Sequence, residues 1–119
     1  MPNNNLTYQR GEIRWVHLDP TVGAETQKTR PCLIVQNDTM NQYGLLTIIV
    51  PFRPGHKKAP YVVNVKASLL NGLDQDRFMD IGQIRAVDHS RILGVLGRLE
   101  DTYWEQIQFA VNVVLGFSL

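Results

Sequence analysis

Residues 11–36 read GEIRWVHLDPTVGAETQKTRPCLIVQ, two apolar runs on either side of a polar segment. The first run is rich in β-branched and aromatic residues, which favours a strand, and the Asp19-Pro20 pair ends it. Residues 20–30 are polar and predict a long loop. The run CLIVQ after Pro31 is short and continuously apolar, which is typical of a strand buried on both faces.

Similar apolar runs follow along the chain. The run LLTIIV at residues 45–50 comes after a turn, QNDTMNQYG, and predicts a buried strand that Pro51 ends. Residues 51–60, PFRPGHKKAP, hold three prolines and a glycine and predict a basic loop, because proline cannot donate to a sheet ladder. The other elements expected in this part are strands at 61–65, 79–87 and 92–99 and a single helical turn at 66–72 closed by Asn71-Gly72.

One long helix is expected at the C-terminus, over residues 102–115. Thr102 with Glu105 three residues later is a capping box, and apolar residues recur behind it at helical spacing. The helix is apolar around much of its circumference, so its second face serves either a dimer contact or simple core packing. About six short strands and one helix indicate a small barrel or a strongly bent sheet.

The composition is that of one small globular domain. The 119 residues are 44% hydrophobic and 19% charged, enough for one core and too few for two. We expect residues 1–9 to be a frayed N-terminal tail and residues 10–119 to be the single domain. No apolar run is long enough to span a bilayer, and the first ten residues lack the apolar core of a secretion signal.

Cysteine usage points to a reducing compartment. Cys32 is the sole cysteine, so it cannot form an intrachain disulfide, and no cluster of His and Cys predicts a zinc site. A cytoplasmic protein with no metal and no membrane partner is therefore expected. Because Cys32 lies in an apolar run, we expect its thiol to be buried rather than reactive.

The formal net charge is only +1, but the charges are unevenly distributed. Residues 26–66 hold six basic residues against one acidic residue, while residues 67–119 hold four against seven. This asymmetry predicts either one positive face on a nearly neutral protein or no more than scattered surface lysines.

The segment from Gly11 to Asp38, GEIRWVHLDPTVGAETQKTRPCLIVQND, resembles the opening of the MazF/PemK toxins. Their pattern is Gly-Asp/Glu-Ile/Val, a strand, Asp-Pro, a loop with a glutamate, Arg-Pro and an apolar strand. The later segments NGL, GQIRAVDHSRI and LGRLED resemble the second half of the same family, so the resemblance covers residues 10–116.

The resemblance implies a fold that is mainly β with a C-terminal helix, a small SH3-like β-barrel of the PemK/CcdB type. It also implies a cytoplasmic homodimer that needs no cofactor or metal, and whose cognate antitoxin blocks the RNA groove with a disordered tail. The implied activity is that of an endoribonuclease that cleaves single-stranded RNA at a short sequence. The 2′-hydroxyl attacks the phosphorus and leaves a 2′,3′-cyclic phosphate and a 5′-hydroxyl.

Arg30 matches the catalytic arginine of the family by its place in the Arg-Pro motif. A guanidinium suits this role because it forks onto two phosphate oxygens and stays protonated. The alternative is a structural ion pair with Glu25 or Asp38. Glu25 matches the glutamate of the family's loop, where it either orients Arg30 or accepts a proton. Lys28 and Thr29 are expected to contact RNA.

At one further site the sequence departs from the family. Arg53 stands where the family has a threonine, two residues after the strand-ending proline. It can stabilise phosphate charge but supplies no hydroxyl. Another branch of the family uses an aspartate directly before its Gln-x-Arg motif, where this chain has Gly82. Gln83, the first residue of that motif, is assigned to RNA binding.

The loop after Arg53 offers further candidates. His56 has an ordinary pKa near 6.5 and suits acid–base catalysis, although a lone loop histidine is more often only solvated. Lys57 and Lys58 are expected to contact phosphates. Phe52 is expected either to stack on a base or to pack in the core.

Two rival functions are left open. One is a CcdB-like toxin that binds gyrase through a tryptophan-containing C-terminal end, which the sequence GFSL at the C-terminus disfavours. The other is a degenerate family member that binds RNA or the antitoxin but cleaves poorly, which the loss of the threonine favours.

Overall fold

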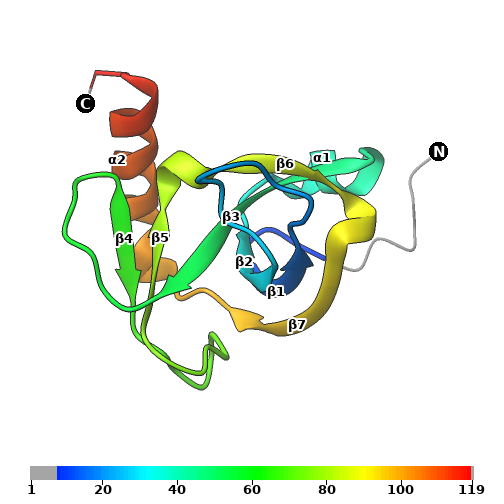
Figure 1. Ribbon diagram of the computed structural model, residues 1–119, viewed down its shortest axis with the longest axis horizontal. Helices are drawn as coiled ribbons and strands as arrows, with labels where there is room; N and C mark the ends of the chain where they lie inside the picture. The colour runs from blue at the N-terminus through cyan, green and yellow to red at the C-terminus, as the bar shows by residue number, and fades with distance from the viewer. Residues whose placement is uncertain (1–7, 119) are drawn as a thin grey trace.

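The computed structural model describes residues 8–118, which form one antiparallel sheet and two α-helices. The seven strands lie in the order β4-β5-β3-β2-β1-β7, with β6 paired to β3. They are β1 (Glu12–His17), β2 (Thr29–Ile34), β3 (Leu46–Pro54), β4 (Val62–Val65), β5 (Arg77–Asp80), β6 (Arg85–Asp88) and β7 (Ile92–Arg98). The helix α2 (Trp104–Leu115) stands beside β4 and β5, and α1 (Asp38–Tyr43) lies toward the other end of the molecule (Figure 1).

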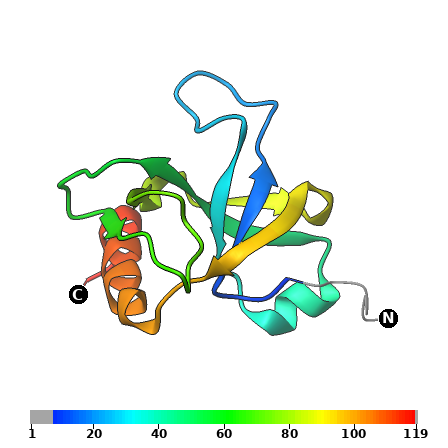
Figure 2. The same cartoon turned by 90° about the horizontal axis from the view of Figure 1, so that it is seen from below.

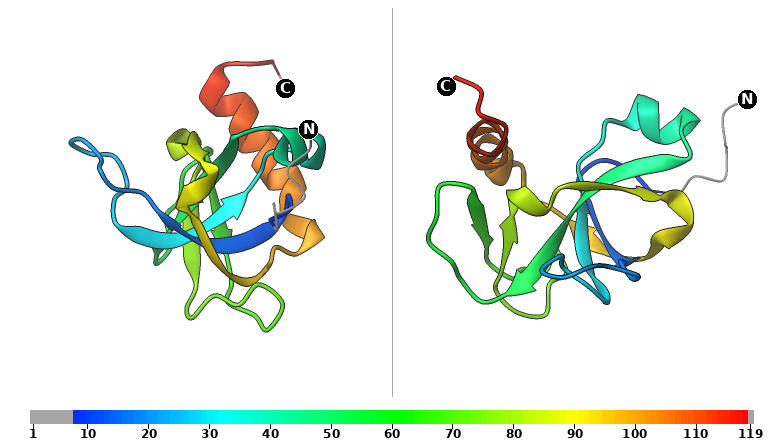
Figure 3. Two further views of the ribbon diagram at one scale, coloured as in Figure 1. Left: turned by 90° about the vertical axis from the view of Figure 1, so that its right-hand side faces the viewer. Right: turned by 45° about the horizontal axis from the view of Figure 1, so that its top comes forward.

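The fold class expected from the sequence is confirmed, since the chain is mainly β with a C-terminal helix. The sheet is strongly bent, but the described pairings leave it open: β7 pairs with β1, and no described strand closes against its other edge (Figure 3). In the part of the chain from residue 8 to residue 118, no helix has both the length and the apolar character that a membrane span requires.

The long strand β3 organises the sheet because it changes partner along its length. Leu46–Ile49 pair with β6, whereas Phe52–Pro54 pair with β5. Pro51, which has no N–H to donate, lies between these two pairings and is opposite Cys32 on β2. The expectation that Pro51 ends the strand is therefore wrong, and the predicted loop begins only after Pro54.

Both faces of the sheet are buried, as the continuous apolar runs predicted. On one face Leu33, Val50 and Phe52 pack with Ile107 and Ala110 of α2. On the other face a second cluster contains Tyr8, Val16, Leu18, Cys32, Ile34, Ile49 and Val87. Tyr8 was expected in a frayed tail but is buried in this cluster; residues 1–7 of that predicted tail lie outside the described residues.

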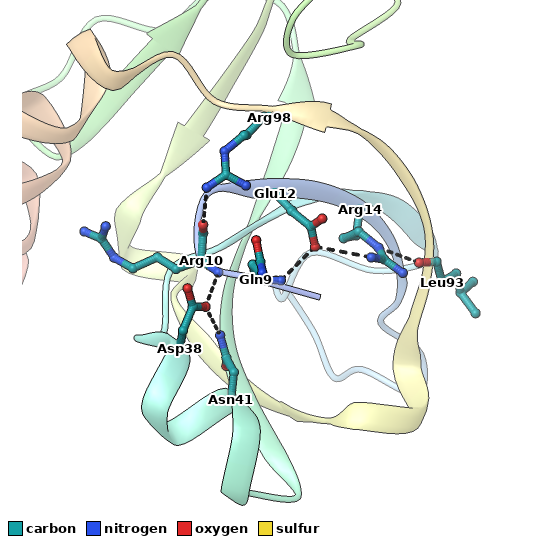
Figure 4. Close-up of polar contacts among 8 residues, drawn as sticks. All are labelled: Gln9, Arg10, Glu12, Arg14, Asp38, Asn41, Leu93 and Arg98. Carbon is teal, nitrogen blue, oxygen red and sulfur yellow. Dashed lines mark hydrogen bonds and ion pairs between the residues drawn. The ribbon is translucent and has the colours of Figure 1, made fainter. Parts of the chain in front are cut away.

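The turn predicted at residues 36–44 contains the short helix α1. Its N-cap is Asn37, whose side-chain oxygen accepts a hydrogen bond from the Met40 N–H. The Arg10 N–H donates to Asp38 Oδ1 at 2.7 Å and so ties the start of the chain to α1 (Figure 4). Asp38 Oδ1 also accepts a hydrogen bond from Asn41 Nδ2, so this carboxylate makes its hydrogen bonds within α1 and to the start of the chain.

Two predicted elements differ from the structure in detail. The strand expected at 79–87 is split by the 3-10 turn η1 (Ile81–Gln83) into β5 and β6. The helix α2 is present, but the 3-10 turn η3 (Asp101–Tyr103) precedes it, and no side chain caps its N-terminus. The expected capping box is therefore wrong.

Glycines allow the turn at residues 68–72 to lie directly on β7. A Cβ on Gly72 would lie 2.0 Å from the Leu96 carbonyl oxygen, and one on Gly97 would lie 2.3 Å from that of Leu70. The Arg98 N–H donates to the same Leu70 oxygen at 2.9 Å. Only glycine fits at these two positions, because any side chain would separate the two backbones.

Candidate functional site

Strand register gathers three arginines on one face of the sheet. Cys32 pairs with Pro51, and the same register continued by two residues places Arg30 opposite Arg53. Arg85 pairs with Ile49, which shares its face with Pro51 and Arg53. Because paired residues and alternate residues point to the same face, Arg30, Arg53 and Arg85 lie together; we call them the arginine face.

Arg30 and Arg53 line one polar pocket of about 210 Å³. The other lining residues come from the loop between β1 and β2: Gly23, Ala24, Glu25, Thr26 and Gln27. This loop projects from the body of the molecule (Figure 2). The structure therefore brings together two guanidiniums and one carboxylate that the sequence analysis singled out.

The end of the Arg30 guanidinium is not used in a structural ion pair. Its Nε donates to the Gln27 carbonyl at 2.9 Å, which fixes the direction of the side chain. Glu25 Oε1 instead accepts the Val22 N–H at 2.6 Å. With Asp38 committed to α1, no ion pair between Arg30 and a carboxylate occurs among residues 8–118. The structural alternative for Arg30 is therefore not supported.

Both ends of the β1–β2 loop are held by hydrogen bonds. Asp19 Oδ1 accepts the Lys28 N–H at 3.0 Å, and the Lys28 carbonyl accepts the Leu18 N–H at 3.0 Å. Arg91 Nη1 donates to the carbonyl oxygens of His17 and Asp19. The side chain of Lys28 is exposed at this anchored end, where it can reach a ligand.

Gln83 reaches the loop from a distant part of the sequence. Its Oε1 accepts hydrogen bonds from the Thr26 N–H at 3.2 Å and from Thr26 Oγ1 at 3.4 Å. Thr26 is buried, so this contact fixes the loop immediately beside Glu25. The side-chain oxygen of Gln83 is thus engaged within the protein, and only its amide N–H groups are left for a ligand.

The loop after β3 lies at a second pocket. His56 lines a pocket of about 240 Å³ together with Lys66, Asp76 and Tyr103, and does not line the pocket of Arg30. Lys57 and Lys58 are exposed. Lys57 Nζ lies 5.8 Å from the centre of the Tyr61 ring, and its backbone is held by Asn64.

Two predicted RNA contacts point away from the arginine face. Phe52 is fully buried in the core that α2 covers, so the expectation that it stacks on a base is wrong. Thr29 neighbours Arg30 in β2 and therefore points to the opposite face, where its Oγ1 lies 3.2 Å from His17 Nδ1. An exposed Thr29 can still contact RNA, but not in the pocket of Arg30.

Arg85 is the arginine of the Gln-x-Arg motif, and the sequence alone assigns it no role. Cys32 lies between it and Arg30 on the same face, and its thiol is buried as expected. Burial raises the pKa of the Cys32 thiol, while the positive charges of Arg85 and Arg30 act in the opposite direction. The strand register places both arginines on the same face of the sheet as Cys32, which the sequence alone does not reveal.

The arrangement is suited to an anionic ligand. Guanidiniums stay charged at any physiological pH and form paired hydrogen bonds with phosphate oxygens. Among the described residues, His, Cys, Asp and Glu do not gather in any group of three that could hold a metal ion.

The chain is similar to known proteins over nearly its whole length. Residues 9–115 match the family model described as PemK-like, MazF-like toxin of type II toxin-antitoxin system. The chain is 32% identical to the endoribonuclease MazF of Staphylococcus saprophyticus over 110 residues, 91% of each protein. It is 27% identical to the endoribonuclease EndoA of Bacillus subtilis, covering 93% of this chain and 97% of EndoA.

Solved structures show the same fold at lower sequence identity. MazF from Deinococcus radiodurans superposes with a TM-score of 0.80 at 21% identity, covering 92% of this chain and 97% of that one. A mycobacterial endoribonuclease in complex with its cognate antitoxin has a TM-score of 0.78 at 18% identity, covering 95% and 99%.

Proposed function

Since the chain belongs to the PemK/MazF family of type II toxin–antitoxin toxins, we propose that it is an endoribonuclease that cleaves single-stranded RNA at a short sequence. One observation carries the proposal: Arg30 and Arg53, neither of them in an ion pair with a described carboxylate, share a pocket with Glu25. That combination provides positive charge for a phosphate beside a group that can accept a proton.

In the proposed reaction the RNA supplies its own nucleophile. The 2′-oxygen forms a bond to the adjacent phosphorus while the bond from phosphorus to the 5′-oxygen breaks, leaving a 2′,3′-cyclic phosphate and a 5′-hydroxyl. One proton leaves the 2′-hydroxyl and one reaches the 5′-oxygen, so no metal or cofactor is needed for balance. Arg30 and Arg53 stabilise the charge that develops on the phosphorane oxygens.

Glu25 is our candidate for the group that takes the first proton. It lies in the same pocket as Arg30, and one of its oxygens is oriented by the Val22 N–H. His56 remains the second candidate for proton transfer, although it lines a different pocket. Lys28, Lys57 and Lys58 are exposed and contact RNA phosphates along the flanking loops in this proposal.

A slow or inactive RNA-binding member of the family is the second candidate function. Arg53 favours it, because a guanidinium cannot replace the hydroxyl that the family's threonine provides. Under this alternative the arginine face binds RNA but the scissile phosphate lacks one of its partners.

We also propose that the protein is a homodimer neutralised by a cognate antitoxin. The mycobacterial relative was solved in complex with its antitoxin, which supports a partner of that kind here. The exposed apolar residues of α2 and the segment after it, Phe109, Leu115 and Phe117, support self-association.

The decisive experiment is incubation with a long RNA in the presence of EDTA, followed by mapping of the ends. We expect cuts at one short sequence, with 2′,3′-cyclic phosphate and 5′-hydroxyl ends, and no such cuts with Arg30→Ala. Binding without cleavage would favour the second candidate, whereas neither binding nor cleavage would rule out both.

A further inference from the structure

The arginines of this protein divide into two groups by their partners. The arginines other than Arg30, Arg53 and Arg85 are engaged: Arg14 with Glu12, Arg77 with Asp74, Arg91 with backbone carbonyls, Arg98 with the Arg10 carbonyl, and Arg10 against the Trp104 ring. On the arginine face, the Arg30 side chain uses only its Nε, and the side chains of Arg53 and Arg85 have no hydrogen bond or ion pair within residues 8–118.

Arg85 is the most unusual of these because it is not fully exposed. Its Nη1 is buried without a hydrogen-bond partner among the described residues, although the residue as a whole is only half-buried. The guanidinium therefore stands at the boundary between the buried cluster around Cys32 and the solvent. A charged group in such a position ordinarily has an acceptor, since an unpartnered buried donor is costly.

Among residues 8–118, no carboxylate forms an ion pair with Arg85. Arg30 and Arg53 lie on the same face of the sheet as Arg85. Two residues before Arg85, Gln83 is bound to Thr26, which lines the pocket of Arg30 and Arg53. Arg85 does not line that pocket itself but lies on the same face of the sheet as its two arginines.

We propose that Arg85 is a third phosphate-binding arginine, which contacts an RNA phosphate adjacent to the one held by Arg30 and Arg53. The inference rests on the proposed function in that it takes RNA as the ligand. Because neighbouring phosphates of a single strand are joined by one nucleotide, a cation beside the pocket is placed to bind the next phosphate along the chain. Arg85 would thereby fix the register of the strand over Arg30.

The test measures binding to an uncleavable RNA that carries 2′-O-methyl groups, as a function of salt, for the parent and Arg85→Met. Loss of one phosphate contact should flatten the slope of log affinity against log salt by about 0.7 and weaken binding roughly tenfold at low salt. Arg85→Lys keeps a point charge and should retain the parental slope. The control Arg98→Met removes an exposed arginine on β7 and should change neither value.

A folded Arg85→Met variant with the parental salt slope overturns the proposal. Should Arg85→Met fail to fold, the parent itself serves: its arginine Nε–H resonances are followed by NMR during titration with the same RNA. The Arg85 resonance, assigned with Arg85→Lys, should shift together with those of Arg30 and Arg53, and an unmoved Arg85 resonance overturns the proposal equally. Neither measurement requires cleavage. An inactive parent would therefore contradict the nuclease proposal, while the proposal for Arg85 would still be tested by RNA binding alone.

Discussion

At the scale of single residues, Arg30 and Arg53 define the site by lining one pocket from the same face of β2 and β3. A buried strand and the Gln27 carbonyl hold Arg30 in position, so its guanidinium is oriented before any ligand arrives. Such fixed charge is what stabilises a phosphorane.

Arg30→Ala should therefore abolish most cleavage while leaving the fold intact. Removing one preorganised donor costs about 2.7–4 kcal/mol of transition-state stabilisation, or roughly 100- to 1000-fold in rate. Arg30→Lys keeps the charge but loses the fork and should recover activity only in part. The measurement is the single-turnover cleavage rate with circular dichroism as a check on folding. Cleavage at the parental rate by a folded Arg30→Ala variant would remove Arg30 from the mechanism.

Arg53 gives opposite results under the two candidate functions. In an active nuclease, Arg53→Ala should slow cleavage and flatten the salt dependence of RNA binding by about one phosphate contact. In a degenerate member the parent should bind RNA but barely cut it, and Arg53→Thr should raise the rate. His56→Ala, in the neighbouring pocket, completes the series. If all three variants match the parent, neither Arg53 nor the loop after β3 plays a part in the site.

The sequence was informative about single residues where a motif names the residue and its strand fixes its direction. Arg30 and Glu25 were found in this way and share a pocket. Phe52 was misjudged because its exposure depends on which face of β3 is covered by α2, a tertiary fact. Arg85 was overlooked because its neighbours Cys32 and Arg30 come from another strand.

At the scale of elements, the β1–β2 loop depends on Gln83, which is 57 residues from Thr26 in the sequence. Gln83→Leu should leave the buried Thr26 N–H without an acceptor and cost about 1–3 kcal/mol of unfolding free energy. Glu25 is bonded to Thr26 in the chain, so a displaced Thr26 also displaces the Glu25 carboxylate. The cleavage rate should therefore fall by more than the loss of folded protein explains. Urea unfolding and cleavage rates measure the two effects, with exposed Gln75→Leu as the control. Unchanged values for both would show that the loop holds its position without Gln83.

Hydrogen bonds to the Glu100 carboxylate join the turn at residues 68–72 to the segment just before α2. Their contribution to stability should depend on pH. Burial raises the pKa of Glu100, but hydrogen bonds from Ser68 Oγ, its own backbone N–H and Asn71 Nδ2 outweigh burial and lower it overall. Because the pKa is lower in the folded protein, the Glu100 carboxylate contributes fully to the free energy of unfolding above the ordinary glutamate pKa of about 4.3. That contribution disappears as the pH falls through the lower pKa of the folded state.

Glu100→Gln should therefore be less stable than the parent at neutral pH, and the difference should shrink as the pH falls to about 3. Urea unfolding across this range provides the measurement, and Glu105→Gln, on the exposed first turn of α2, is the matched control. A difference in stability that stays constant with pH would show that the Glu100 carboxylate is not responsible.

Elements were predicted best where a long periodic pattern decides the structure. The helix α2 was found because its apolar residues recur at helical spacing, and the strands β1 and β2 because each contains a short apolar run. Pro51 led to the wrong end for β3. It does not interrupt the strand because it lies where β3 changes partner from β6 to β5, which the sequence does not show. The missing cap of α2 reflects the 3-10 turn before it, which displaces Thr102 from the capping position.

At the scale of the whole molecule, α2 buries one face and leaves apolar residues of another face exposed. Ile107 and Ala110 face the core, whereas Phe109, Val114 and Leu115 are exposed at 46%, 36% and 58%. We expect a dimer by light scattering at micromolar concentration. Val114→Asp should shift it toward monomer, because the interface would then bury an unpaired charge. A parent chain that scatters as a clean 13.5 kDa monomer would refute this prediction.

The opposed Arg30 and Arg53 also make the choice of buffer part of any experiment on this protein. A solute anion that binds the folded arginine face but not the unfolded chain stabilises the fold by mass action, by about 2.7 kcal/mol at a hundred times its dissociation constant. The same anion competes with RNA for the same guanidiniums. Phosphate-based solutions should therefore yield the most heat-resistant preparation and the slowest enzyme, so thermal stability and activity are to be compared only in one and the same buffer.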